Sequence, residues 1–252
     1  MSDYKHPLGN FKISIIKFLG KAFSSISLFF LSFLFRIKKN ESEIIISSAF
    51  YAPWKEDKEF SNFYNKVNEY TLLDNKRLYT LWHFSKSLKN LKSDILDIGC
   101  LQGGAGYVMS KASKKGKIYL IDTFEGLIEN ENYHKKDHFV FRDINFVKNK
   151  IKSYKLKNTK VIKAKFPKDI SKKFHKKKFK LCHVDVNTYN ATKLSFEFIR
   201  KKIIKNGVVI FDDYGIYSTQ GVKKYVDSIM KVYKNDFSFV NNYMGQCILI
   251  KK

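Results

Sequence analysis

The chain has 252 residues, enough for one large α/β domain with a modest extension. Hydrophobic residues make up 44% of the chain and aromatic residues 16%, so a sizeable core can form and a wholly disordered protein is excluded. The formal net charge is +25, from 48 Lys+Arg against 23 Asp+Glu, yet only four of the basic residues are arginines. Proteins that read nucleic-acid sequence use arginine for paired base contacts. A low-GC codon bias therefore explains the lysines better, and we predict no nucleic-acid partner.

The three cysteines, Cys100, Cys182 and Cys247, are far apart and form no CxxC or Cys/His cluster of the kind that binds zinc. Each stands in an apolar, strand-like setting. We therefore predict buried free thiols in a reducing compartment, which favours the cytoplasm.

The first predicted element is an amphipathic helix over residues 11–37, within an N-terminal extension of residues 1–39. Its longest uncharged stretch, residues 22–35, is shorter than the roughly 20 residues that a membrane-spanning helix needs. Serines and lysines fall largely on one face, interrupted by Leu28, and Ile, Leu and Phe fall on the other. This pattern is typical of a helix in the interface of a membrane, here the inner face of the cytoplasmic membrane. The alternatives are docking on the protein's own core or on a second subunit of a homo-oligomer, and a signal peptide is disfavoured because basic residues follow instead of a cleavage site.

Residues 40–75 are predicted to be irregular, with Ala52-Pro53-Trp54 as a break, and residues 76–252 to form the main domain. A helix is predicted over residues 75–91, at the start of this domain, and strands and helices alternate after it. The predicted strands are 95–98, 117–121, 159–162, 180–184 and 208–211, and the predicted helices are 103–113, 146–154, 192–204 and 221–232. Asn206-Gly207 reads as the stop of the helix over 192–204, and residues 237–240 and 246–250 as an antiparallel hairpin. Strands separated by helices predict a doubly wound α/β fold with a mostly parallel sheet.

A glycine-rich loop follows the first of these strands. It has the pattern G-x-x-x-G-G, in which Gly99, Gly103 and Gly104 follow Asp97. Glycines there let the backbone turn tightly and approach a ligand closely. A dinucleotide enzyme would have G-x-G-x-x-G to hold a pyrophosphate. The pattern instead favours a cofactor without phosphates but with a cationic sulfonium and an amino-acid end, namely S-adenosylmethionine.

Asp122 ends the second strand. An acidic side chain at this place can accept both ribose hydroxyls of a nucleoside cofactor. The alternative is a cap for the next helix, and together with the glycine loop we favour ribose binding.

Three further carboxylates follow the fourth and fifth strands: Asp185, Asp212 and Asp213. Neighbouring strand ends would bring them to one edge of the cofactor cleft, where like charges need a cation or a proton. Oxygen ligands of this kind suit Mg²⁺. The alternative is that Asp212 or Asp213 caps a loop.

These motifs together resemble the macrocin O-methyltransferase-like (TylF-type) family of class I, Rossmann-like methyltransferases. The resemblance runs from about Glu69 to the C-terminus. The matching segments are residues 70–74 with 77–81, the glycine loop, Asp122-Thr123-Phe124-Glu125-Gly126-Leu127, Asp185-Val186-Asn187-Thr188-Tyr189 followed by Thr192, and Asp212-Asp213-Tyr214.

The resemblance implies sugar-hydroxyl methylation with S-adenosylmethionine and a divalent metal, usually Mg²⁺. It places the cofactor at Thr71, Asp97, Gly99, Gly103, Gly104, Asp122 and Phe124, the metal at Asp185, Asp212 and Asp213, and catalysis at Asp185 and Asn187. One departure is important: where the family has a second acidic residue that takes the substrate proton, this chain has Asn187, and asparagine is not a general base. Another group could accept the proton, a metal could lower the pKa of the acceptor, or the acceptor could differ. His183 is a candidate base, although a histidine inside a buried strand is more often a packing residue.

The leading hypothesis is therefore metal-assisted O-methylation of a small-molecule or glycan-precursor hydroxyl. An N-methyltransferase, or an enzyme for a phosphorylated or nucleotide-linked acceptor, would depend less on the residue at position 187. From another class, the chain could be a non-catalytic membrane-associated module on a methyltransferase scaffold. The intact glycine loop and Asp122 argue against that reading. The base-stacking motif of nucleic-acid methyltransferases is absent after the fourth strand.

Overall fold

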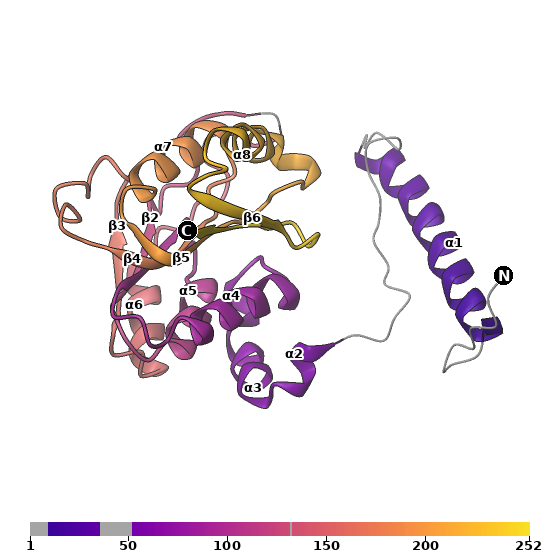
Figure 1. Ribbon diagram of the computed structural model, residues 1–252, viewed down its shortest axis with the longest axis horizontal. Coiled ribbons are helices and arrows are strands. Elements are labelled where there is room, and N and C mark those ends of the chain that lie inside the picture. The colour runs from indigo at the N-terminus through magenta and orange to yellow at the C-terminus, as the bar shows by residue number, and fades with distance from the viewer. Residues whose placement is uncertain (1–9, 36–51, 132) are drawn as a thin grey trace. The chain divides into compact units, whose positions relative to one another are not determined.

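The computed structural model describes residues 10–35, 52–131 and 133–252 (Figure 1). The chain divides into two compact units, Met1–Pro53 and Trp54–Lys252. In the first unit, helix α1 spans Asn10–Phe35, close to the predicted helix. The predictions made for residues 36–51 lie outside the described residues. Within the described parts of the chain, no helix combines the length and the apolar composition needed to cross a membrane.

A seven-stranded sheet forms the centre of the second unit. Its strands are β1 (Asp94–Ile98), β2 (Ile118–Asp122), β3 (Thr159–Lys163), β4 (Phe179–Val184), β5 (Ile203–Phe211), β6 (Phe237–Asn241) and β7 (Cys247–Lys251), and their order is β3-β2-β1-β4-β5-β7-β6. The first five strands are parallel, and β7 pairs antiparallel with both β5 and β6. The predicted doubly wound sheet with a C-terminal hairpin is confirmed.

Helices cover both faces of this sheet (Figure 1). From residue 53 onward the helices are α2 (Pro53–Glu56), α3 (Lys58–Val67), α4 (Asn75–Ser87), α5 (Gly104–Ala112), α6 (Ile144–Ser153), α7 (Tyr189–Ile199) and α8 (Gln220–Val232), with short 3-10 helices η2 (Asn68–Tyr70) and η3 (Tyr217–Thr219). Two hydrophobic cores result: one packs α3, α4 and α5 on the sheet and the other packs α7 and α8 on it. Because both faces are covered, every residue of β4 is buried, including the polar Lys180 and His183.

The irregular segment predicted between residues 40 and 75 is partly wrong, since α2, α3 and η2 lie in it. Pro53 is the first residue of α2, a position where proline starts a helix because its missing N–H is not needed there. Helix α3 begins after Asp57, whose carboxylate accepts a hydrogen bond from the Phe60 amide, and it buries Phe60, Phe63 and Val67 at helical spacing. The expected break was therefore a helix start.

The predicted helix over 192–204 is also wrong at its end, because α7 finishes at Ile199 and β5 already begins at Ile203. Asn206-Gly207 is part of β5 and does not stop a helix. The pairing of β4 with β5 jumps from Phe179–Ile203 to Leu181–Val208, so the intervening residues form an irregularity in the strand. Asn206 has a φ of 60°, which is usual at such a bulge.

Candidate active site

A cavity of about 270 Å³ opens at the carboxyl ends of the parallel strands. The order of strands reverses between β1 and β4, and this switch point is where open α/β sheets bind ligands. Of the predicted site residues, the cavity is lined by Thr71, Gly99, Asp122, Asp185, Asn187 and Asp213. Its wall does not include Asp97, Gly103, Gly104, Phe124 or Asp212.

The glycines of the loop are required by the packing of the chain. Gly99 has a φ of 87°, and a Cβ on it would lie 1.7 Å from the backbone oxygen of Asp185. A Cβ on Gly103 would lie 2.6 Å from the ring of Tyr107, and one on Gly104 would lie 2.5 Å from the backbone oxygen of Tyr70. The loop therefore brings the end of β1 directly against the end of β4.

Asp122 holds the loop in place. Its Oδ2 accepts a 2.8 Å hydrogen bond from the Leu101 amide and its Oδ1 accepts one of 2.8 Å from the Phe124 amide. Burial raises the pKa of Asp122, while these two backbone bonds favour its charged form. Oδ1 has a further, long contact of 3.5 Å with the Thr123 hydroxyl, which donates at 2.9 Å to the Gly126 backbone oxygen. Both carboxylate oxygens therefore keep the capacity to accept from a ligand in the cavity.

Asp97 lies deeper than the prediction placed it. Its side chain is fully buried, and its Oδ1 lies 2.8 Å from Nδ1 of His183. Its Oδ2 has no hydrogen-bond partner among the described residues. The structure therefore connects Asp97 to β4 and leaves it out of the cavity wall.

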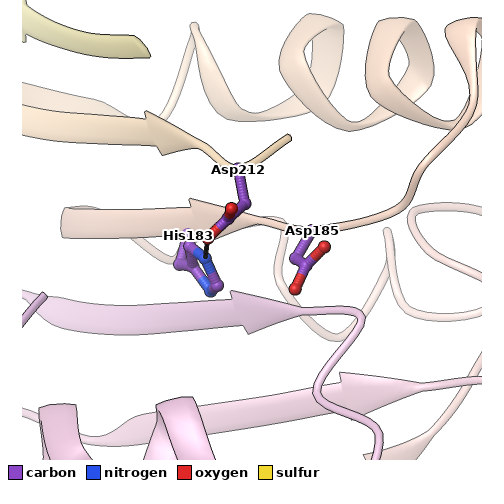
Figure 2. Close-up of side chains that lie close together, drawn as sticks. All are labelled: His183, Asp185 and Asp212. Atoms are coloured by element: carbon purple, nitrogen blue, oxygen red, sulfur yellow. Dashed lines mark hydrogen bonds and ion pairs between the residues drawn. The ribbon is translucent and has the colours of Figure 1, made fainter. Parts of the chain in front are cut away.

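His183 joins two strands through its imidazole. Its Nε2 lies 3.1 Å from Oδ2 of Asp212 (Figure 2). Together with Asp97 at Nδ1, both ring nitrogens therefore contact a carboxylate. Burial alone would lower the pKa of His183, but the hydrogen bonds to Asp212 and Asp97 outweigh it and raise the pKa to about 10. His183 is therefore an imidazolium at neutral pH, and neither nitrogen is free to accept a proton from a substrate.

Four hydrogen bonds saturate Asp212. Oδ1 accepts from Arg77 Nη1 at 2.6 Å and from the Asp213 amide at 2.8 Å, and Oδ2 accepts from His183 and from Gln246 Nε2 at 3.0 Å. Burial would raise the pKa of Asp212, but His183, Arg77 and Gln246 lower it overall. Asp212 is thus an ionised carboxylate that fixes two cations.

Asp185 and Asp213 face the cavity with fewer partners. The described residues give the Asp185 carboxylate no hydrogen bond, and burial followed by repulsion from Asp213 and Asp212 raises its pKa well above the ordinary value. Asp213 accepts a 2.8 Å bond from the Asn187 amide and a 3.4 Å contact from Arg77, and burial and the neighbouring Asp212 raise its pKa to about 6. Asn187 and Asp213 both have left-handed backbone, with φ of 61° and 62°. Such strain is concentrated at functional sites.

The donor set fits a divalent cation. The ligand-type atoms of His183, Asp185 and Asp212 lie within 4.8 Å of one another in the described part of the chain. Both nitrogens of His183 and both oxygens of Asp212 are already hydrogen-bonded, so the carboxylates of this group with acceptor capacity at the cavity are those of Asp185 and Asp213. A cation there would relieve the repulsion that raises the pKa of both cavity-facing carboxyls.

Two residues of this site were missed at the level of sequence. Arg77, from α4, contacts Asp212 and Asp213 and is itself in the cavity wall. The rarity of arginine was a usable signal, since only four of the 48 Lys and Arg residues of the chain are arginines and Arg77 is one of them.

His134, from the loop between β2 and α6, also lines the cavity and is 8% exposed. Its Nε2 is buried and has no hydrogen-bond partner among the described residues, and burial together with His138 lowers its pKa. No pattern in the sequence marked it.

The loop that carries His134 is fixed on both sides of the cavity. Glu129 accepts from Thr188 Oγ1 at 2.6 Å, and Glu131 accepts from the Tyr189 amide at 2.7 Å, directly after Asn187 in the chain. On the other side, the hydroxyls of Tyr133 and Tyr217 are hydrogen-bonded. His134 is thus held between the segments that carry Asn187 and Asp213.

The parallel sheet, the cavity at its switch point and the glycine loop define a Rossmann-like methyltransferase. Residues 32–237 match the model of the macrocin O-methyltransferase (TylF) family, and the chain belongs to that family. The predicted family and fold class are both confirmed.

Several solved structures share the fold of this chain. The O-methyltransferase NovP has 16% identity and a TM-score of 0.60, over 73% of this chain and 82% of NovP. CalS11, a calicheamicin methyltransferase, has 11% identity and a TM-score of 0.57, over 81% of this chain and 99% of CalS11. An O-methyltransferase from Bacillus cereus in complex with SAH has 13% identity and a TM-score of 0.55, over 92% of this chain and 99% of that one. No curated protein matches the sequence.

Proposed function

We propose that the chain transfers a methyl group from S-adenosylmethionine to a hydroxyl of a sugar or glycan precursor, assisted by a divalent cation. The observation that carries the proposal is one cavity with Asp122 on its β2 side and Asp185 with Asp213 on its β4–β5 side. The similar structures support it, because they include O-methyltransferases, a calicheamicin methyltransferase and an enzyme with bound SAH.

The β2 side would hold the cofactor. Both oxygens of Asp122 keep the capacity to accept from the two ribose hydroxyls, and the backbone of Gly99 lines the cavity without a side chain. Thr71 closes this side, and its Oγ1 accepts from the Leu73 amide at 3.1 Å. When bound, S-adenosylmethionine supplies the methyl group as an electrophile next to these residues.

The β4–β5 side would hold the cation and the acceptor. Asp185 and Asp213 are the donors, and a bound Mg²⁺ would lower the pKa of an acceptor hydroxyl. Arg77 and His183 keep Asp212 ionised and in place, so this carboxylate positions Asp213 through its backbone amide.

The residue proposed to take up the proton of the acceptor as its oxygen is methylated is His134, which lines the cavity. Its Nε2 is covered in this structure, so the imidazole would have to turn toward the acceptor. Asn187 cannot accept it, because its amide donates to Asp213, and His183 is already protonated. His134 has the neutral imidazole and the unpartnered nitrogen that a general base needs. An unsatisfied buried nitrogen costs about 1–3 kcal/mol, so a ligand hydroxyl at this atom would also stabilise the loop.

Cofactor binding is the direct test. Titration calorimetry of the wild-type chain should show binding of S-adenosylmethionine, and Asp122→Ala should weaken it by about 1–3 kcal/mol, the size of a lost set of charge-assisted hydrogen bonds. The matched control is Asp236→Ala, which removes an exposed aspartate paired with Lys251 and should leave the affinity unchanged. A wild-type chain that binds no S-adenosylmethionine would remove the basis of the proposal.

Transfer itself is tested with methyl-labelled S-adenosylmethionine and a panel of nucleotide sugars. Turnover should stop in EDTA, return with Mg²⁺, and fall about 10²–10⁴-fold in His134→Gln, the range usual for a lost general base. Cofactor affinity should be unchanged in His134→Gln. Full activity in EDTA would give Asp185 and Asp213 structural roles, and full activity of His134→Gln would exclude it as the base.

A further inference from the structure

Helix α1 (Asn10–Phe35) presents a broad apolar face that is exposed. Eight bulky apolar residues between Ile15 and Phe33, five of them phenylalanines, are 41 to 83% exposed. The described residues of the second unit have nine exposed large apolar side chains, spread over a much longer stretch of chain. Concentration of this kind marks an interaction surface rather than ordinary surface composition.

The eight residues lie on one side of the helix. They follow one another at intervals of one, three or four residues, which at 100° per residue places them within an arc of about 140°. Lys21 and Ser24 lie on the other side, and Ser25 lies just outside the edge of the arc. A coiled-coil partner needs a narrow seam of two positions per heptad, whereas an arc this wide suits a flat apolar surface.

The charge of the segment indicates which kind of apolar surface its exposed face would bind. Residues 10–35 contain three lysines and no acidic residue, and Arg36, Lys38 and Lys39 follow before the next acidic residue, Glu41. A second copy of α1 would bring no negative charge to these basic residues. An anionic lipid surface offers acyl chains for the phenylalanines and negative headgroups for the lysines.

We propose that α1 lies in the interface of an anionic lipid bilayer and tethers the methyltransferase unit to it. The apolar face, from Ile15 to Phe33, enters the region between headgroups and acyl chains, and Lys21 remains among the headgroups. The absence of a membrane-crossing helix from the described residues agrees with a helix that lies in the plane of the surface.

The test uses the full chain and vesicles of phosphatidylcholine with 30% phosphatidylglycerol. Wild type should co-sediment with them, and its partition should fall at least tenfold on pure phosphatidylcholine vesicles and at high salt. Phe23→Asn with Phe30→Asn, on the apolar face, should reduce binding to the anionic vesicles at least tenfold. Ser24→Asn with Ser27→Asn, which lie between Phe23 and Phe30 in the chain but outside this arc, should bind like wild type.

Three results would overturn the proposal. These are no binding by the wild-type chain, equal binding by both double variants, or a wild-type oligomer that dissociates in the Phe23/Phe30 variant with no vesicle binding by either. The last result would assign the face to a second copy. Thermal unfolding of all variants checks that the methyltransferase unit remains folded, so that loss of binding reports on α1 alone.

Discussion

The two sides of the cavity stabilise their carboxylates by different means. On the β2 side, Asp122 is held by two backbone amides, that of Phe124 two residues further on and that of Leu101 in the glycine loop after β1. On the β4–β5 side, Asp212 is held by Arg77, His183 and Gln246, which come from α4, β4 and the turn before β7. The first arrangement is local and the second is made of side chains brought together over long distances in the chain.

This difference has an energetic consequence. A carboxylate that accepts backbone bonds can be removed without leaving a buried charge. A carboxylate between two buried cations cannot, because breaking a buried ion pair leaves the other charge without compensation. We therefore expect changes on the β2 side to act mainly on ligand binding and changes on the β4–β5 side to act mainly on stability.

The largest effect is expected where the two sides meet. Gly99→Ala should lower the free energy of unfolding by more than about 4 kcal/mol, because its Cβ would lie 1.7 Å from the Asp185 backbone oxygen. The matched control is Gly215→Ala, which has the same kind of backbone, with a φ of 84°, but no atom within 4 Å of the new Cβ. It should cost only about 1–2 kcal/mol of left-handed strain. Urea denaturation measures both, and equal losses would show that contact between β1 and β4 is not what requires Gly99.

Asp212→Asn should lower the free energy of unfolding by about 3–5 kcal/mol, since it removes the fully buried carboxylate that His183 and Arg77 share. His183 would keep only Asp97, and Arg77 would keep only the more exposed Asp74 and the longer contact with Asp213. Asp213→Asn, one residue further, should cost about 1 kcal/mol or less. Its contact with Arg77 is longer, at 3.4 Å, and its removal relieves repulsion with Asp185. Chemical denaturation in EDTA compares the two. A small effect of Asp212→Asn on the free energy of unfolding would mean that the carboxylate on the β4–β5 side does not act mainly on stability.

The last expected effect concerns pH and develops gradually over several pH units. Folding raises the pKa of His183 from 6.5 to about 10, so the stability that it contributes is fully present below pH 6.5 and is lost as the pH rises to about 10. The difference in unfolding free energy between wild type and His183→Gln should therefore shrink over this range. Thermal and urea unfolding at several pH values, in EDTA, measure it. A difference that is constant from pH 6.5 to 10 would show that His183 is not held as an imidazolium.

Local patterns in the sequence were sufficient for most of the fold. The buried strands are short apolar runs with helical periods between them, and these patterns predicted the sheet, its helices and the hairpin. The errors fell where a local signal has two meanings. Pro53 marks both a break and a helix start, and Asn206-Gly207 marks both a helix stop and a bulge.

The residues of the candidate site also fall into two groups, those that the sequence predicted and those that only the structure revealed. The sequence by itself determined the glycine loop, Asp122 and the acidic pair Asp212-Asp213, because each is a short motif tied to the end of one strand. Only the tertiary structure decided that Asp97 lies under the loop against His183, that Arg77 reaches Asp212 from 135 residues away, and that His134 lines the cavity. The physical reason is that the charge of a buried carboxyl or imidazole depends on whichever groups lie within a few ångströms of it. Local sequence does not specify which distant residues those are.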